Sequence, residues 1–129
     1  MATWNEVKGM LQSNFPTQMI NDKMIGLKVP ITETRTQNVI VIGNNSDLFG
    51  ETFQICSCIG KIPNHKLPEA LLEVFDRVIG GIVAYDGDYY LRENIQASEY
   101  HKESFLKQMG SIAVMADVME EKYIGGDKY

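Results

Sequence analysis

The chain contains few cysteines, few prolines and no long hydrophobic run. Its 129 residues include two cysteines, four prolines and a single tryptophan. No apolar stretch approaches the roughly 18 residues that cross a bilayer, so we expect neither a membrane-spanning helix nor a membrane partner. The N-terminus has no positive region followed by an apolar core, which predicts a cytoplasmic protein without a secretory signal whose cysteines stay reduced.

Basic residues are also in deficit. Twelve lysines and arginines stand against 17 aspartates and glutamates, giving a net charge of −5 and a pI near 5.0. The basic residues are scattered along the chain rather than clustered. Because nucleic-acid binding depends on neutralising phosphates, this pattern argues against a nucleic-acid partner. An acidic surface favours solubility or a partner with basic segments.

Motifs for phosphate binding and nucleophilic catalysis are missing as well. The sequence has no GxGxxG, P-loop or GxSxG pattern. We therefore predict no catalytic residues, no cofactor and no enzymatic activity.

The residues that are present predict a single α+β domain over residues 1–129. A chain of this length, 44% hydrophobic and 22% charged, can bury a core without metal or disulfide support. Thr3 and Glu6 form a capping-box signature for a first helix that stops before Pro16. Three strands follow at 23–30, 36–43 and 52–60, where the hydrophobic period falls toward two. The middle strand is apolar throughout 39–42, which predicts a central strand covered on both faces.

The second half of the chain predicts a short helix, a hairpin and a long helix. Pro68 fits the first turn of the short helix and Gly80 its left-handed stop. Ser98 is expected to cap a final helix of about 25 residues with one apolar stripe, which ends at Gly125-Gly126 before a mobile tail. The predicted order is α-β-β-β-α-β-β-α, a twisted antiparallel sheet packed by helices.

The hairpin sequence also predicts a register. Asp86-Gly87 suits a two-residue turn, because both residues tolerate positive φ. The strands then pair so that one face of the hairpin carries Val83, Tyr85 and Tyr90. A small sheet covered by helices on one side faces water on the other, so these bulky side chains require a cover. That cover is a helix of the chain, a second copy of it, or another protein.

Two cysteines in one strand raise the question of a metal site. Cys56 and Cys58 share a face, with His65 nearby, an arrangement open to metal ligation or to two small structural side chains. Zinc sites use four ligands at recurring spacings, and the chain has two cysteines and two histidines in all. We prefer the structural interpretation and predict no metal.

Two acidic positions also have alternative interpretations. Asp86-Gly87-Asp88 with Glu93 is weakly similar to a calcium loop, but helices flank an EF-hand loop and strands flank this one, so a hairpin explains it better. Asp117 lies in an apolar stretch, where a carboxylate serves as a catalytic acid or as a structural hydrogen-bond acceptor. We favour the acceptor.

The chain resembles the type III secretion chaperone fold, which is shared with YbjN-type proteins. The features that carry the resemblance are the element order, the small acidic chain, the glycine-led hairpin from Gly80 to Arg92 and a long last helix containing Ala116-Asp117. The resemblance covers nearly the whole chain. It implies a homodimer in which the second helix forms much of the interface. In the secretion chaperones, an unfolded segment of a secreted effector wraps the dimer and lies in apolar grooves on its sheet. The resemblance implies no catalytic residue.

The expected function is therefore that of a non-enzymatic, homodimeric chaperone-like or adaptor protein that holds an extended segment of another protein. The expected partner-binding residues are Val83, Tyr85 and Tyr90. The expected dimer interface comprises Leu71, Leu72, Phe75, Val78 and Ile79. Two alternatives stay open: a YbjN-type regulatory protein, or a small-molecule-binding or enzymatic α+β domain with a pocket between sheet and helices.

Overall fold

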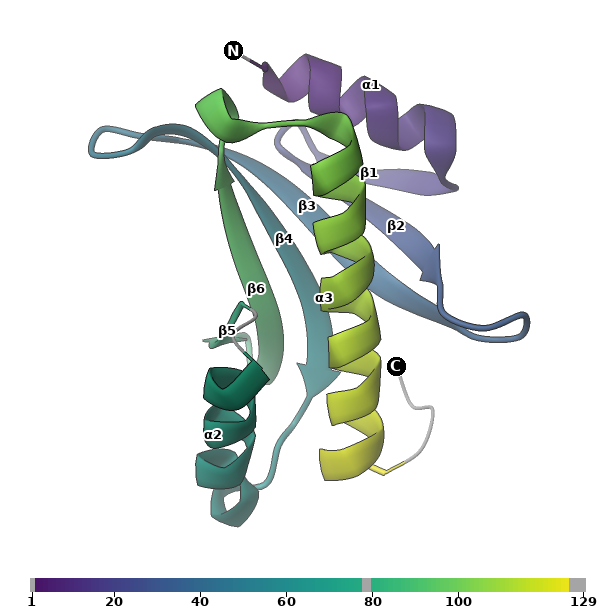
Figure 1. The fold of residues 1–129 in the computed structure, drawn as a ribbon, viewed down its shortest axis with the longest axis vertical. Coiled ribbons are helices and arrows are strands. Elements are labelled where there is room, and N and C mark those ends of the chain that lie inside the picture. The colour runs from purple at the N-terminus through teal and green to yellow at the C-terminus, as the bar shows by residue number, and fades with distance from the viewer. Residues whose placement is uncertain (1, 78–79, 126–129) are drawn as a thin grey trace.

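A computed structural model describes residues 2–77 and 80–125 of the chain. Its elements are, in chain order, α1 (Trp4–Asn14), β1 (Thr17–Asn21), β2 (Met24–Pro30), β3 (Thr36–Ser46), β4 (Gly50–Gly60), η1 (Asn64–Lys66), α2 (Leu67–Arg77), β5 (Gly81–Tyr85), β6 (Asp88–Gln96), η2 (Ala97–Glu99) and α3 (Lys102–Tyr123). The strands form one antiparallel sheet in the order β1-β2-β3-β4-β6-β5. The helix α3 crosses one face of this sheet, α1 lies near one end of α3, and α2 lies near the other (Figure 1). The predicted α+β class is confirmed.

The first helix begins as the sequence predicts and is held on the sheet by its tryptophan. The Thr3 hydroxyl accepts a hydrogen bond from the Glu6 amide at 3.2 Å, which caps α1. The indole of Trp4 donates to the Asp22 carbonyl at 2.8 Å and lies flat against Gly43 of β3. A Cβ added at Gly43 would stand 2.7 Å from the ring, so glycine is what allows this close approach.

The structure adds a strand, β1, that the sequence did not predict. Four of its five residues are exposed, so it has no alternation of apolar and polar residues for a periodicity argument to detect. It pairs with β2 at the edge of the sheet. The turn between the two strands is closed by the Asn21 side chain, which accepts a hydrogen bond from the Lys23 amide at 2.9 Å.

The β5–β6 hairpin has the predicted register. Asp86 and Gly87 form the turn with φ of 51° and 85°, as a two-residue hairpin loop requires. The cross-strand pairs are Gly81 with Arg92, Ile82 with Leu91, Val83 with Tyr90, Ala84 with Tyr89, and Tyr85 with Asp88. The strand β6 then continues to Gln96 and pairs along β4, which joins the hairpin to the centre of the sheet.

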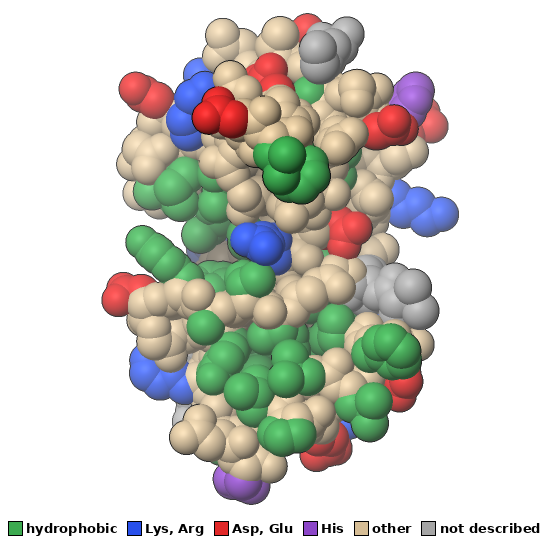
Figure 2. Space-filling model, turned by 90° about the vertical axis from the view of Figure 1, so that its left-hand side faces the viewer, with side chains coloured by type: hydrophobic (Ala, Val, Ile, Leu, Met, Phe, Trp, Pro, Cys, Tyr) green, Lys and Arg blue, Asp and Glu red, His purple; other side chains and the backbone are tan. Residues whose placement is uncertain are grey.

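The helix α2 turns most of its predicted apolar stripe outward. Its buried residues are Ala70 and Val74, whereas Leu71, Leu72 and Phe75 are 48%, 60% and 77% exposed. Figure 2 shows hydrophobic side chains gathered over the lower half of this side of the molecule, where α2 and β5 lie. The other two residues of the predicted interface, Val78 and Ile79, lie outside the described residues.

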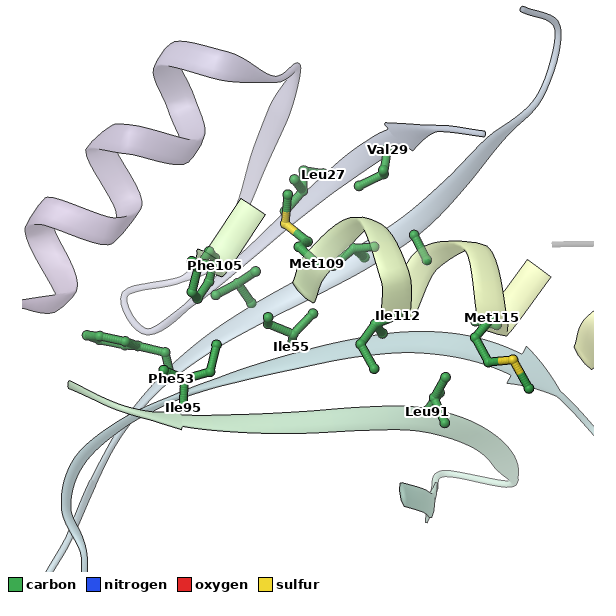
Figure 3. Close-up of a cluster of buried hydrophobic side chains, with 14 of the residues drawn as sticks. Leu27, Val29, Phe53, Ile55, Leu91, Ile95, Phe105, Met109, Ile112 and Met115 are labelled. Atoms are coloured by element: carbon green, nitrogen blue, oxygen red, sulfur yellow. The ribbon is translucent and has the colours of Figure 1, made fainter. Parts of the chain in front are cut away.

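The helix α3 supplies the centre of the core. Its predicted stripe is buried throughout: Phe105, Met109, Ile112, Ala116, Met119 and Tyr123. Figure 3 shows Phe105, Met109 and Ile112 of this stripe meeting side chains of the strands, among them Leu27, Ile55 and Leu91. The predicted start was wrong, because His101 and not Ser98 occupies the N-cap. Since β6 runs on to Gln96, the chain still has to turn through η2 before the helix can begin.

Asp117 ties α3 to the connection between β2 and β3. It is 7% exposed and accepts a hydrogen bond from the Arg35 guanidinium. Glu121, one turn further on, lies 3.8 Å from the same guanidinium. Asp117 thus accepts a hydrogen bond, as the structural interpretation predicts.

Glu73 ties α2 to the last turn of α3. Its carboxylate accepts hydrogen bonds from the Tyr123 hydroxyl at 2.7 Å and from the Lys122 ammonium at 2.9 Å. Burial raises the pKa of Glu73, but the hydrogen bonds from Lys122 and Tyr123, with the charges of Lys122 and Arg77, outweigh it and lower the pKa overall. The folded chain therefore favours the charged form of this carboxyl.

Gly43→Ala should destabilise the fold, because the new methyl group would overlap the Trp4 ring, and overpacking of this kind costs about 1–3 kcal/mol. Gly9→Ala is the matched control: a Cβ at Gly9 meets nothing within 4 Å, and alanine stabilises a helix interior by roughly 0.5–1 kcal/mol over glycine. Urea unfolding followed by the fluorescence of the single tryptophan measures both changes. A Gly43→Ala protein as stable as the wild type would contradict the packing.

The Glu73 cluster predicts a loss of stability in acid. Because the pKa of Glu73 is lower in the folded state, its contribution is complete above the unfolded-state pKa, about 4.3, and is lost as pH falls through the folded-state pKa. Glu73→Gln should lower the unfolding free energy at neutral pH by about 1–2 kcal/mol and flatten its decline below about pH 4.5.

Denaturant unfolding at pH 7, 4 and 3 measures this effect. Glu69→Gln is the control. The Glu69 side chain is 64% exposed and lies as far as 3.8 Å from the Lys122 ammonium. An exposed ion pair of this length contributes little to the free energy of unfolding. Equal pH slopes for wild type and Glu73→Gln would show that the cluster does not stabilise the fold.

Candidate functional site: the open face of the sheet

One face of the sheet has no helical cover in the described part of the chain. The buried hydrophobic residues of α1, α2 and α3 all join one core cluster with Val39 and Val41 of β3. Because side chains alternate along a strand, Ile40 and Ile42 point to the opposite face, where both are half-buried. We call this second surface the open face. The sequence predicted that strand 39–42 is covered on both faces. Within residues 2–77 and 80–125, helices cover only one of them.

The centre of the open face is an apolar groove with a volume of about 450 Å³. We call it the central groove. It brings together all three residues predicted to bind a partner, Val83, Tyr85 and Tyr90, with Ile40 and Ile42 from β3. Tyr85 is 67% exposed, and Val83 and Tyr90 are half-buried. No described helix of the chain packs over these tyrosines.

Two further grooves adjoin the central one. The first, of about 510 Å³, runs beside β1 and shares Ile40 with the central groove; we call it the β1 groove. The second, of about 560 Å³, lies toward the turn between β3 and β4 and shares Gln54 and Arg92; we call it the amide groove. Its lining is largely amide and hydroxyl side chains: Asn44, Thr52, Gln54, Asn94 and Gln96. The three grooves cross the open face from the β1 edge to the hairpin.

The two cysteines lie beside the central groove as free thiols. Burial raises the pKa of both; the Asp88 charge adds to the rise at Cys58, and the Arg92 charge partly offsets it at Cys56. Both thiols are therefore protonated at neutral pH, the form that is a poor nucleophile and a poor metal ligand. No group of three or more histidine, cysteine or acidic side chains that could hold a metal occurs among the described residues.

The Tyr90 hydroxyl lies next to the Cys58 thiol. Burial raises the pKa of Tyr90, and the neighbouring Cys58, Asp88 and Asp86 raise it further. Its hydroxyl thus stays protonated at neutral pH. Tyr85, with no such partner in the described residues, is the more accessible ring.

The space between the sheet and α3 is filled by core side chains. Phe105, Met109 and Ile112 enter it from the helix and meet Phe53 and Ile55 from β4 (Figure 3). The grooves described above therefore lie outside this layer, on the surface of the sheet. The alternative function, a pocket between sheet and helices, would place a ligand in the filled layer and not in these grooves.

Sequence reasoning located the aromatic part of this site and missed its polar part. Arg92, Gln54 and Met24 also line the central groove, and the amide groove was not predicted. A signal was present, since Arg92 and Asn94 continue the alternation that places Tyr90 on the open face. The contributions of β2 and β4 depend on pairing between strands far apart in sequence.

Comparison with known proteins assigns no family to this chain. No protein-family model matches it, and no curated protein or solved structure is significantly similar to it. The resemblance to type III secretion chaperones and YbjN-type proteins therefore stays a prediction. What the open face does has to be argued from its geometry.

Proposed function

We propose that this protein is a non-enzymatic, homodimeric chaperone-like or adaptor protein that binds an extended segment of another protein on its open face. The observation that carries the proposal is the central groove, where Ile40, Ile42, Val83, Tyr85 and Tyr90 form an apolar surface on a face without helical cover. Apolar surface gathered in this way is typical of interaction sites.

An extended segment matches the shape of this site. Its alternate side chains can enter the grooves, which follow one another across the sheet, while its backbone pairs with a strand edge. The edge strand β5 carries Val83 and Tyr85 and has neither a charged residue nor a proline between Gly81 and Tyr85. The opposite edge, β1, follows Pro16 and has a register irregularity between Met19 and Asn21, two features that oppose pairing. The β5 edge is thus the more receptive one.

A second copy of the chain is the proposed cover for α2. Leu71, Leu72 and Phe75 form an exposed apolar row on this helix, next to β5. A two-fold interface uses the same patch on both subunits, so a compact apolar row on a helix suits it. A stable interface of ordinary size buries about 800 Å² per subunit.

One observation supports a cytoplasmic site of action for this proposed adaptor. Cys56 and Cys58 are both free, as expected in a reducing compartment. In the described part of the chain, no helix combines the length and hydrophobicity needed to span a bilayer.

Light scattering tests the dimer. The wild type should have a mass twice the 14.6 kDa of one chain at micromolar concentration, and Phe75→Asp should have the mass of one chain. Because Phe75 is 77% exposed within a single chain, the substitution should leave the subunit folded. Val114→Asp, at a valine 48% exposed on α3, is the matched control and should stay dimeric. A wild type that scatters as a single chain would exclude the dimer.

Fluorescence anisotropy tests the open face. The probe is a labelled 12-residue peptide in which leucine or valine alternates with glutamine. Tyr85→Ala should weaken its binding by about 1–3 kcal/mol, roughly 5- to 150-fold, because exposed aromatic residues often dominate such contacts. Val118→Ala, which shortens an apolar side chain 41% exposed on α3, should bind as the wild type does. Failure of the wild type to bind any peptide of this pattern would overturn the proposed function.

A further inference from the structure

No carboxylate is found among the described residues that line the three grooves of the open face. Among the described residues that line them, the charged side chains are Lys28 and Arg92, both positive. The chain as a whole has 17 acidic residues against 12 basic ones and a net charge of −5. The site proposed to bind a partner therefore has the opposite sign from the protein around it.

Three of the acidic residues close in sequence to the grooves are directed away or held by other groups. Glu93 pairs across the sheet with Ile55, which belongs to the core face. Glu51 accepts a hydrogen bond from the Trp4 amide at the start of α1. Asp88 is held by the Lys61 ammonium at 3.2 Å. Asp86, in the hairpin turn, adds a negative charge near Tyr90 at one end of the central groove. The positive charge is therefore left uncompensated at Arg92 and Lys28, and not over the whole of the grooves.

Arg92 is placed to receive an anion. It is half-buried and lines both the central groove and the amide groove. Its cross-strand neighbour on β5 is Gly81, which has no side chain to cover the guanidinium, and a Cβ there would meet nothing within 4 Å. Neither Arg92 nor Lys28 forms an ion pair within residues 2–77 and 80–125.

We propose that the segment bound on the open face is acidic as well as apolar, with a carboxylate on Arg92 between apolar side chains that enter the central groove. The inference rests on the proposed function and names the chemistry of its partner. A guanidinium binds a carboxylate through two parallel hydrogen bonds, which adds orientation to attraction. Lys28, in the β1 groove, offers a second carboxylate site beyond Ile40. Beyond Arg92, the amide and hydroxyl side chains of the amide groove can form hydrogen bonds with polar groups of the bound segment.

The local charge of the grooves predicts a different partner from the net charge of the protein. An overall charge of −5 favours basic partners, but the groups within reach of a bound segment are the two cations of the grooves. A nucleic acid is not the favoured anion, because its affinity rises with the number of phosphates neutralised and the grooves offer only these two cations among their described residues.

Competition between three peptides tests the inference. They share the alternating apolar residues of the probe above and carry glutamate, glutamine or lysine at the intervening positions. At about 0.1 M salt the wild type should bind the glutamate peptide at least about tenfold more tightly than the lysine peptide. Arg92→Glu should reverse this order. Lys102→Glu, a reversal at an exposed residue outside the grooves, should preserve it.

The possible failures are distinguishable. Equal binding of all three peptides by the wild type overturns the acidic partner and leaves the proposed function standing, whereas no binding of any of them overturns both. Tighter binding of a single-stranded 12-mer oligonucleotide than of the glutamate peptide also overturns the inference. Circular dichroism establishes that each variant is folded. If Arg92→Glu does not fold, Arg92→Gln decides, since it should abolish the preference for glutamate over glutamine.

Discussion

The packing of α3 on one face of the sheet determines what the rest of the molecule can do. A single apolar helix face covers a single sheet face, and every strand that buries alternate residues beneath α3 presents the intervening ones on the other side. In β3 this rule divides four consecutive apolar residues into Val39 and Val41 inside and Ile40 and Ile42 outside. The open face is thus a direct consequence of a strand that is apolar on both sides and covered on one.

Local rules predicted the parts of the fold that depend on neighbours in sequence. The two-residue turn at Asp86-Gly87 determines the whole β5–β6 register, and a 3.6-residue period defines the buried stripe of α3. The strand β1 escaped prediction because an exposed edge strand requires no apolar alternation. The outward side of α2 and the start of α3 depend on tertiary context: α2 packs beside β5, and β6 runs on to Gln96 before α3 can begin.

The same distinction applies to the site. Val83, Tyr85 and Tyr90 were predicted because one hairpin contains them all. The polar half of the site is assembled from β3, β4 and β6, whose contributing residues lie up to about 50 positions apart, and no local pattern reports such pairing. Arg92 stands at the boundary between the two halves, since it follows Tyr90 by one full alternation and faces Cys56 across the sheet.

If the open face binds a partner as proposed, the distribution of charge is what would make its apolar surfaces selective. An exposed row on α2 and an open sheet edge at β5 favour indiscriminate association, while like charges over the remaining surface oppose it at distances up to about 8 Å, the Debye length at physiological salt. The absence of carboxylates from the described lining of the grooves would remove that repulsion at the proposed docking site and preserve it elsewhere. An acidic segment then meets attraction at Arg92 and repulsion over most of the other surface, so the partner's charge helps to select the open face over the other apolar patches.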